Sequence, residues 1–208
     1  MILLLEPDLS AYTDEQYQAD LMLLPAQRYE KARKYRFTED RKRCVRAYML
    51  LREGLRREYG YTDAPVFDFG PHGKPFLPDL PDVHFSLSHT GNAVLCALDD
   101  HPIGADIEML RIRRMDHLLS ILSSEEHEAV LQDPQPEHRF LEFWTRKESF
   151  LKFTGQGLPG IRALQEIPTV DTDTVCFETI ICEADGFLYS VCRPKSHSSE
   201  LPLKLSIQ

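Results

Sequence analysis

Long apolar runs are absent from this sequence of 208 residues. A helix that crosses a bilayer needs about 18 or more consecutive apolar residues, and no segment approaches that length. Residues 1–5 (MILLL) are apolar, but no basic leader precedes them, and Glu6 and Pro7 follow directly. We therefore expect a first β-strand here instead of a signal peptide, and no membrane partner.

The cysteines of this sequence do not have the spacing that is typical of a cross-linked fold. The five cysteines are scattered, odd in number and never spaced as C-x-x-C. A disulfide framework and a structural zinc site both depend on paired cysteines, so neither is indicated. This usage fits a reducing compartment, and we predict a cytoplasmic location.

Two common phosphate-binding motifs are missing as well. The sequence contains no G-x-x-x-x-G-K-[ST] loop and no G-x-G-x-x-G turn. Nothing in it therefore indicates a nucleotide site of the Walker or the Rossmann type.

Basic residues are scarce outside one segment. The net charge is −9, yet residues 28–58 hold 12 of the 24 Lys and Arg residues and five acidic ones. This segment thus carries a surplus of seven positive charges, and the rest of the chain carries −16. A solvated helix face explains most such runs, but a one-sided surplus also suits a polyanionic partner. Nucleic acid is not expected, because the acidic remainder would repel it.

Hydrophobic periodicity and turn residues predict helices and strands in mixed order. The first part should begin with a strand at 2–5, a helix opened by a capping box at Thr13, and a helix after Pro25. A longer helix, capped by Thr38, should end near Gly60. Short strands are expected at 66–69, 84–88, 93–98 and 104–107.

The second part repeats this mixture. We expect a helix that begins near Ser124, a long amphipathic helix at 137–153 stopped by Gly155, and strands at 175–182 and 187–192. The sequence therefore predicts an α+β fold of two similar small lobes, related by a pseudo-twofold, with the active site in the cleft between them.

The boundary between these lobes should lie close to Pro102. We predict an N-terminal lobe at 1–102 that supplies phosphate contacts, and a C-terminal lobe at 103–208 that carries a metal site and a catalytic helix.

A pair of carboxylates in a predicted strand is the first candidate site. Asp106 and Glu108 flank Ile107, and alternate side chains of a strand point to the same face. Two carboxylates on one face, with room for water and phosphate oxygens, are a common way to hold Mg²⁺. A D-x-E pair at a strand end or in a salt bridge needs no such function, so this signal is weak alone.

The segment 143–152 (FWTRKESFLK), within the helix predicted at 137–153, is the second candidate. Trp144, Glu148 and Lys152 recur at every fourth position and share one face of the helix. Ordinary surface ion pairs beside an aromatic stripe would also explain them. Glu148 could instead complete a metal site or act as a base, and Lys152 could bind a phosphate.

Two polar segments complete the set of candidates. Ser88 and His89 end a predicted strand among small hydroxyl residues, where His89 is either structural or a donor to a phosphate. Lys74 lies in a tight turn and indicates little by itself.

In this order, the motifs resemble the 4′-phosphopantetheinyl transferases, specifically the two-domain type that activates surfactin-type nonribosomal peptide synthetases. The resemblance runs from about residue 25 to residue 160. Its matching segments are 73–75, 78–82, 84–89, 102–108, 143–152 and 155–158, with the basic stretch through residues 39–43. Ser86 departs from the family pattern, in which Asn is common, and the segment after Pro168 matches poorly.

The resemblance implies transfer of phosphopantetheine from coenzyme A to a serine of an apo acyl or peptidyl carrier protein, with release of adenosine 3′,5′-bisphosphate. It implies Mg²⁺, for which Mn²⁺ is expected to substitute, and a role in nonribosomal peptide, polyketide or fatty-acid synthesis. A monomer is expected, because a two-lobed chain can place the site at its own lobe interface.

Residue roles follow from the same resemblance. Asp106, Glu108 and Glu148 would bind the metal, and Glu148 would activate the serine, directly or through a metal-bound water. Lys152 is expected to contribute to catalysis as well. The expected coenzyme A contacts are Arg28, Lys31, Arg43, Lys74, Ser88, His89 and Lys152.

Two other functions use the same residues. A metal-dependent phosphohydrolase would need the same acids but no docking surface for a carrier protein. A non-catalytic module that binds coenzyme A or a carrier protein would not need all three acids and both lysines, Lys74 and Lys152.

Overall fold

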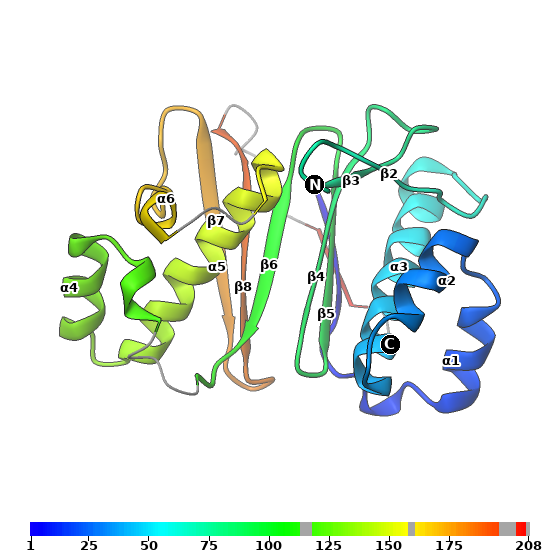
Figure 1. The fold of residues 1–208 in the computed structure, drawn as a ribbon, viewed down its shortest axis with the longest axis horizontal. Helices are drawn as coiled ribbons and strands as arrows, with labels where there is room; N and C mark the ends of the chain where they lie inside the picture. The colour runs from blue at the N-terminus through cyan, green and yellow to red at the C-terminus, as the bar shows by residue number, and fades with distance from the viewer. Residues whose placement is uncertain (113–117, 158–160, 196–202, 207–208) are drawn as a thin grey trace.

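The computed structural model describes residues 1–112, 118–157, 161–195 and 203–206 of the chain. Its helices and sheets confirm the predicted α+β class. In Figure 1 the strands occupy the centre of the molecule, and helices flank them on both sides. No helix of the described part is long and apolar enough to cross a membrane.

The first sheet combines strands from both ends of the chain. Its order is β4 (His84–Thr90), β5 (Ala93–Asp99), β1 (Ile2–Glu6) and β9 (Leu203–Ser206). Strand β1 pairs antiparallel with β5 and parallel with β9. The lobe boundary near residue 102 stays a prediction, and the first sheet takes its last strand from the far end of the chain.

Three α-helices lie beside the first sheet: α1 (Asp14–Leu21), α2 (Ala26–Arg33) and α3 (Thr38–Tyr59). A short 3₁₀ turn, η1 (Leu9–Ala11), follows β1. Helix α3 packs directly on the sheet, where its Leu50 and Leu51 belong to the same buried cluster as Leu98 of β5. The apolar face of α3, which the sequence predicts from the helical spacing of its apolar residues, therefore lies against the sheet.

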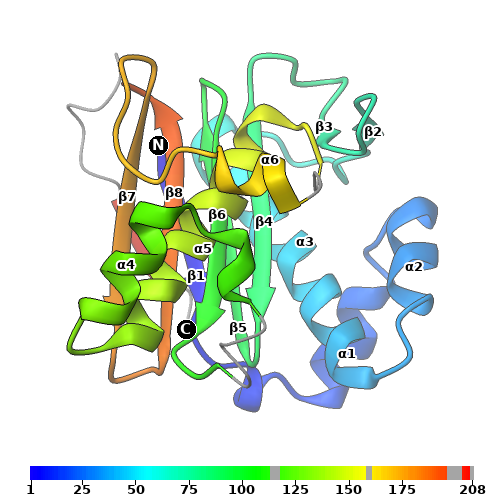
Figure 2. The ribbon, with the colours of Figure 1, turned by 60° about the vertical axis from the view of Figure 1, so that its left-hand side comes forward.

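The second sheet has the order β6 (Gly104–Met109), β8 (Phe187–Pro194) and β7 (Val175–Cys182), with all neighbours antiparallel. Helix α5 (Pro136–Thr154) packs across β6 and β8. The elements α4 (Ser124–Gln132), α6 (Ile161–Gln165) and η3 (Leu119–Ile121) lie outside α5, as Figure 2 shows.

Strand β5 is buried on both faces, which explains its almost wholly apolar sequence. Val94 and Cys96 join the cluster under α3, whereas Leu95 and Ala97 join Ile107 of β6 in a second cluster between the sheets. A strand covered on both sides reads as a continuous apolar run, because neither face meets water.

Close packing of α5 on β6 depends on Gly104. A Cβ atom at this position would lie 1.9 Å from the carbonyl oxygen of Ser149, so a larger residue would push the helix away. This contact brings the face of α5 that carries Glu148 next to the carboxylates of β6.

Most predicted elements are confirmed, and the differences are local. The Thr13 capping box is present, and Gly60 ends α3 with a left-handed backbone. Thr38 was the wrong cap: Phe37 occupies that position and makes no side-chain cap bond. The strand expected at 66–69 is shorter, because β2 (Asp68–Phe69) pairs with β3 (Pro75–Phe76) over two residues each. Three short elements, β3, α6 and β9, lie where the sequence predicts no helix or strand.

Candidate functional site

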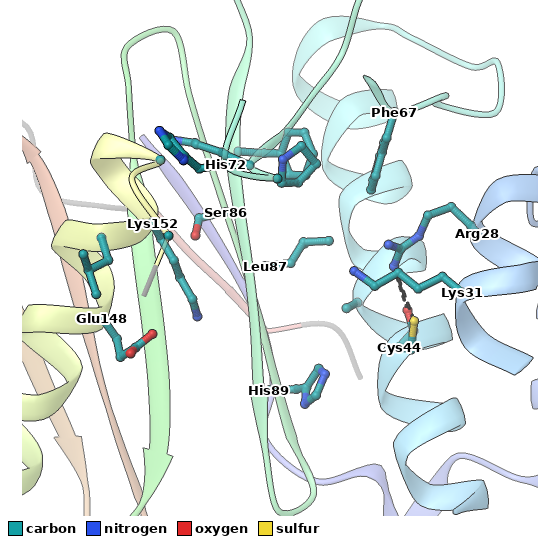
Figure 3. A pocket seen from close by; sticks show the side chains of 18 of the residues that line it. Arg28, Lys31, Cys44, Phe67, His72, Ser86, Leu87, His89, Glu148 and Lys152 are labelled. Atoms are coloured by element: carbon teal, nitrogen blue, oxygen red, sulfur yellow. Dashed lines mark hydrogen bonds between the residues drawn. The ribbon is translucent and has the colours of Figure 1, made fainter. Parts of the chain in front are cut away.

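A cleft of about 340 Å³ separates the helices of the first sheet from α5. Strand β4, the β2–β3 connection and the last turns of α5 form its walls. Figure 3 shows Arg28 and Lys31 on one side and Glu148 and Lys152 on the other. The predicted site residues that line it are Arg28, Lys31, Lys74, His89, Glu148 and Lys152. These residues come from separate segments, and the fold brings them to one cleft.

Arg28 is a buried cation at the α2 side of the cleft. Its side chain is 4% exposed, and the guanidinium lies 4.9 Å from the centre of the Phe67 ring. Its Nη2 donates to the Cys44 carbonyl at 3.3 Å, while its Nε is buried without a hydrogen-bond partner among the described residues. A buried guanidinium with an unused donor is suited to an anion.

Lys31 adds a second positive charge beside Arg28. Burial, and next the charge of Arg28, lower the pKa of Lys31. Both effects disfavour the ammonium form, and a bound anion would oppose them.

Lys74 connects the two walls of the cleft. Its Nζ donates to the carbonyl of Phe153 at 2.8 Å and to that of Ile103 at 3.3 Å. Burial lowers the pKa of Lys74 to about 8. The ammonium thus holds the end of α5 against the turn that carries Lys74.

Two carboxylates of β6 lie beyond this cleft on one face of the strand. Asp106 and Glu108 both contact hydroxyl groups of β4, while Ile107 is 1% exposed and lies in the core between the sheets. The predicted alternation is therefore confirmed. Asp106 Oδ1 accepts from Ser88 Oγ at 2.7 Å and from Lys152 Nζ at 2.6 Å.

Glu148 faces these carboxylates from α5. Burial raises the pKa of Glu148 to about 7, and the charges of Asp106 and Glu108 add to this effect. Burial and the neighbouring Asp106 also raise the pKa of Glu108. The three acids are close enough to repel one another, which a divalent cation would relieve.

The chemistry of these donors fits Mg²⁺ or Mn²⁺. Asp106 Oδ2 and Glu148 Oε1 are buried carboxylate oxygens without a hydrogen-bond partner among the described residues. Hard oxygen ligands are what Mg²⁺ requires. No three His, Cys, Asp or Glu side chains of the described chain converge as a ready-made metal cage, and the Lys152 ammonium lies at Asp106.

Arg43 and Ser88 are predicted site residues outside the lining of the cleft. Arg43 donates to the Gly91 carbonyl and pairs with Asp40, which anchors α3 to the β4–β5 turn. Ser88 donates to Asp106 from the edge strand β4. His89 does line the cleft, and its burial, with the charges of Arg43 and Lys152, lowers its pKa.

A buried ion pair next to Glu148 on α5 was not predicted from the sequence. Lys147 is 0% exposed, and its Nζ donates to Glu126 at 2.9 Å and to the carbonyls of Leu164 and Ile167 at 2.9 and 3.1 Å. One signal was available: Lys147 lies four residues after Phe143, on the apolar side of the helix. The apolar side chains that line the cleft, among them Tyr35, Cys44, Phe67 and Leu87, were not predicted either.

Comparisons with known proteins agree on one family. Residues 102–199 match the model of the 4′-phosphopantetheinyl transferase superfamily. The 4′-phosphopantetheinyl transferase Sfp of Bacillus subtilis (strain 168) is 33% identical over 194 residues, which is 86% of each chain. Another 4′-phosphopantetheinyl transferase of Bacillus subtilis is 37% identical over 137 residues, 64% of this chain and 61% of the relative. The 4′-phosphopantetheinyl transferase HetI of Nostoc sp. is 33% identical over 170 residues, 77% of this chain and 70% of the relative.

Proposed function

The chain belongs to the 4′-phosphopantetheinyl transferase superfamily, and we propose that it moves phosphopantetheine from coenzyme A to a serine of an apo acyl or peptidyl carrier protein. Adenosine 3′,5′-bisphosphate is the second product. The observation that carries this proposal is the position of Lys152 and Glu148, which extend from α5 between a cleft rich in cations and the carboxylates of β6.

The cleft suits coenzyme A because its cations come from several sides. Coenzyme A carries a pyrophosphate and a 3′-phosphate, and these need positive partners along their length. In our proposal Arg28 and Lys31 bind one phosphate from α2, and Lys152 binds the pyrophosphate from α5. Further coenzyme A contacts are assigned to Arg43, Lys74, Ser88 and His89.

Asp106, Glu108 and Glu148 would together hold Mg²⁺ or Mn²⁺ against the pyrophosphate. The ion would supply positive charge that offsets the charge of the phosphates during attack. The unpartnered oxygens of Asp106 and Glu148 support this assignment.

The chemical step is a displacement at the phosphorus that carries pantetheine. The serine Oγ forms a bond to this phosphorus, and the bond to the bridging pyrophosphate oxygen breaks. Glu148 takes the serine proton, because it is the one of the three acids that lines the cleft. Lys152 lies one helical turn further along α5 and stabilises the negative charge on the leaving bisphosphate.

The oligomeric state, the location and the partners of the protein are also part of this proposal. A monomer is expected, because one chain contributes all the assigned residues, from α2, α3, the β2–β3 connection, β4, β6 and α5. The scattered cysteines favour the cytoplasm. Neither nucleic acid nor a membrane is assigned as a partner.

One assay tests the function against its alternatives. The protein is incubated with coenzyme A, Mg²⁺ and an apo carrier protein, and the carrier is weighed by mass spectrometry. A gain of one phosphopantetheine supports the transferase. Cleavage of coenzyme A without a heavier carrier would show a phosphohydrolase, and binding without either product would show a non-catalytic module.

A further inference from the structure

Three hydroxyl side chains form a row along the edge strand β4. Ser86, Ser88 and Thr90 occupy every second position, so their side chains lie on the same face of the strand. Each contacts β6, the edge strand of the other sheet. The row therefore joins two sheets at edges that Figure 1 shows side by side.

Ser86 and Ser88, the first two residues of the row, each form hydrogen bonds with a different residue of β6. Ser86 Oγ accepts from the backbone N–H of Ala105 at 2.9 Å and lies 3.3 Å from the carbonyl of the same residue. Ser88 Oγ donates to Asp106 at 2.7 Å. Ser86 thus fixes the register of the two strands, and Ser88 contacts the first carboxylate.

Thr90 is the third member, and it contacts the second carboxylate. Its Oγ1 donates to Glu108 Oε2 at 3.0 Å, while Trp144 Nε1 of α5 lies 3.4 Å from Oε1. Both oxygens of Glu108 therefore have a donor from a different element. A carboxylate held at both oxygens loses rotational freedom before any ligand arrives.

The turn that follows Thr90 is itself fixed against β6. Gly91 has a φ of +48°, and a Cβ atom there would lie 2.6 Å from the sulfur of Met109. Arg43 of α3 donates to the Gly91 carbonyl. The position of the Thr90 hydroxyl is thus determined by packing on both sides of the turn.

We propose that Thr90 is a positioning residue that orients Glu108 for the divalent cation. This inference rests on the proposed function for the identity of the metal site. Thr90 acts through Glu108 and is assigned no contact with coenzyme A. Outer-shell partners of metal ligands typically change metal affinity by about 10–100-fold when they are removed.

The primary test measures metal binding instead of turnover. Mn²⁺ binding to the whole chain with coenzyme A present is followed by electron paramagnetic resonance for the wild type, Thr90→Val and Thr90→Ser. Thr90→Val keeps the shape of the side chain and should weaken Mn²⁺ binding about tenfold or more, whereas Thr90→Ser keeps the hydroxyl and should bind almost normally. Thr154→Val removes an exposed hydroxyl at the end of α5 and should have no effect.

A double-mutant cycle separates positioning from a general loss of structure. In a Glu108→Gln background, Thr90→Val should cause little further loss of Mn²⁺ affinity, because its effect acts through Glu108. In the transfer assay, Thr90→Val should raise the Mg²⁺ concentration for half-maximal rate and leave the KM for coenzyme A unchanged.

Wild-type affinity for Mn²⁺ in Thr90→Val would overturn the inference, as would additive losses in the double variant. A wild-type chain that binds Mn²⁺ but never modifies a carrier would instead reject the proposed function. The two failures are thus distinguishable.

Discussion

The Lys152 ammonium lies 2.6 Å from Asp106 Oδ1, which joins α5 to β6 at the wall of the cleft. Asp106 is almost fully buried, with a side chain 7% exposed, and Lys152 is 30% exposed. Ser88 contributes a second bond to the same oxygen and a hydroxyl 2.9 Å from Lys152 Nζ. A residue proposed to bind phosphate and a residue proposed to bind metal are therefore in direct contact before substrate arrives.

Removing this ammonium should affect both stability and substrate binding. Lys152→Met leaves the buried Asp106 with fewer donors, and such a loss typically costs about 1–3 kcal/mol. We expect lower stability in urea denaturation and a higher KM for coenzyme A. Lys152→Arg keeps the charge and should recover most of the stability. Unchanged stability and KM in Lys152→Met would contradict the importance of the pair.

Asp106 should be indispensable for transfer. Asp106→Asn keeps the shape of the side chain but removes the charge that would hold the metal. The transfer rate, measured by the mass gain of the carrier, should fall by about a hundredfold or more. Mg²⁺ should also cease to raise the melting temperature. Full activity in this variant would remove Asp106 from the proposed site.

Lys74 should make stability depend on pH in the alkaline range. Burial lowers the pKa of Lys74 in the folded state to about 8, below its ordinary value of 10.5. Between these values the unfolded state binds more protons, so the free energy of unfolding should rise with pH. The measurement compares the free energy of unfolding of the wild type with that of Lys74→Met, by urea denaturation from pH 7 to pH 10.

Coenzyme A provides a control for this assignment. A phosphate bound at Lys74 would favour the ammonium form and raise the pKa of Lys74. The stability difference between wild type and Lys74→Met should therefore change at higher pH when coenzyme A is present. If this stability difference changes over the same pH range with and without coenzyme A, the result would contradict a phosphate contact at Lys74.

Lys147 should matter for stability through its buried partner. Lys147→Met leaves the Glu126 carboxylate without its ammonium, and breaking a buried pair in this way costs about 3–5 kcal/mol. The measurement is the free energy of unfolding in urea. A double variant, Lys147→Met with Glu126→Gln, removes both charges and should recover much of the loss. A single variant as stable as the wild type would show that the pair is dispensable.

Local features of the fold were predictable because they depend on neighbouring residues. The capping box at Thr13 and the glycine that ends α3 are confirmed. Thr38 was assigned as a cap from its residue type, but the backbone enters the helix one residue earlier, at Phe37. Short pairings such as β2 with β3 have too few residues to show a period.

The sequence by itself determined which residues share a face. The period of two on β6 places Asp106 and Glu108 together, and the helical period on α5 aligns Trp144, Glu148 and Lys152. Family resemblance then suggested what these residues do, and the comparisons confirmed the family.

Only the tertiary structure decided which faces meet. The approach of α5 to β6 over Gly104, the bond of Lys74 to the end of α5, and the contact of Thr90 with Glu108 all join segments far apart in the chain. Such contacts depend on how the cores under α3, between the sheets and under α5 pack together. Local sequence preferences hold no information on these distances, because each distance is set by the packing of the whole molecule.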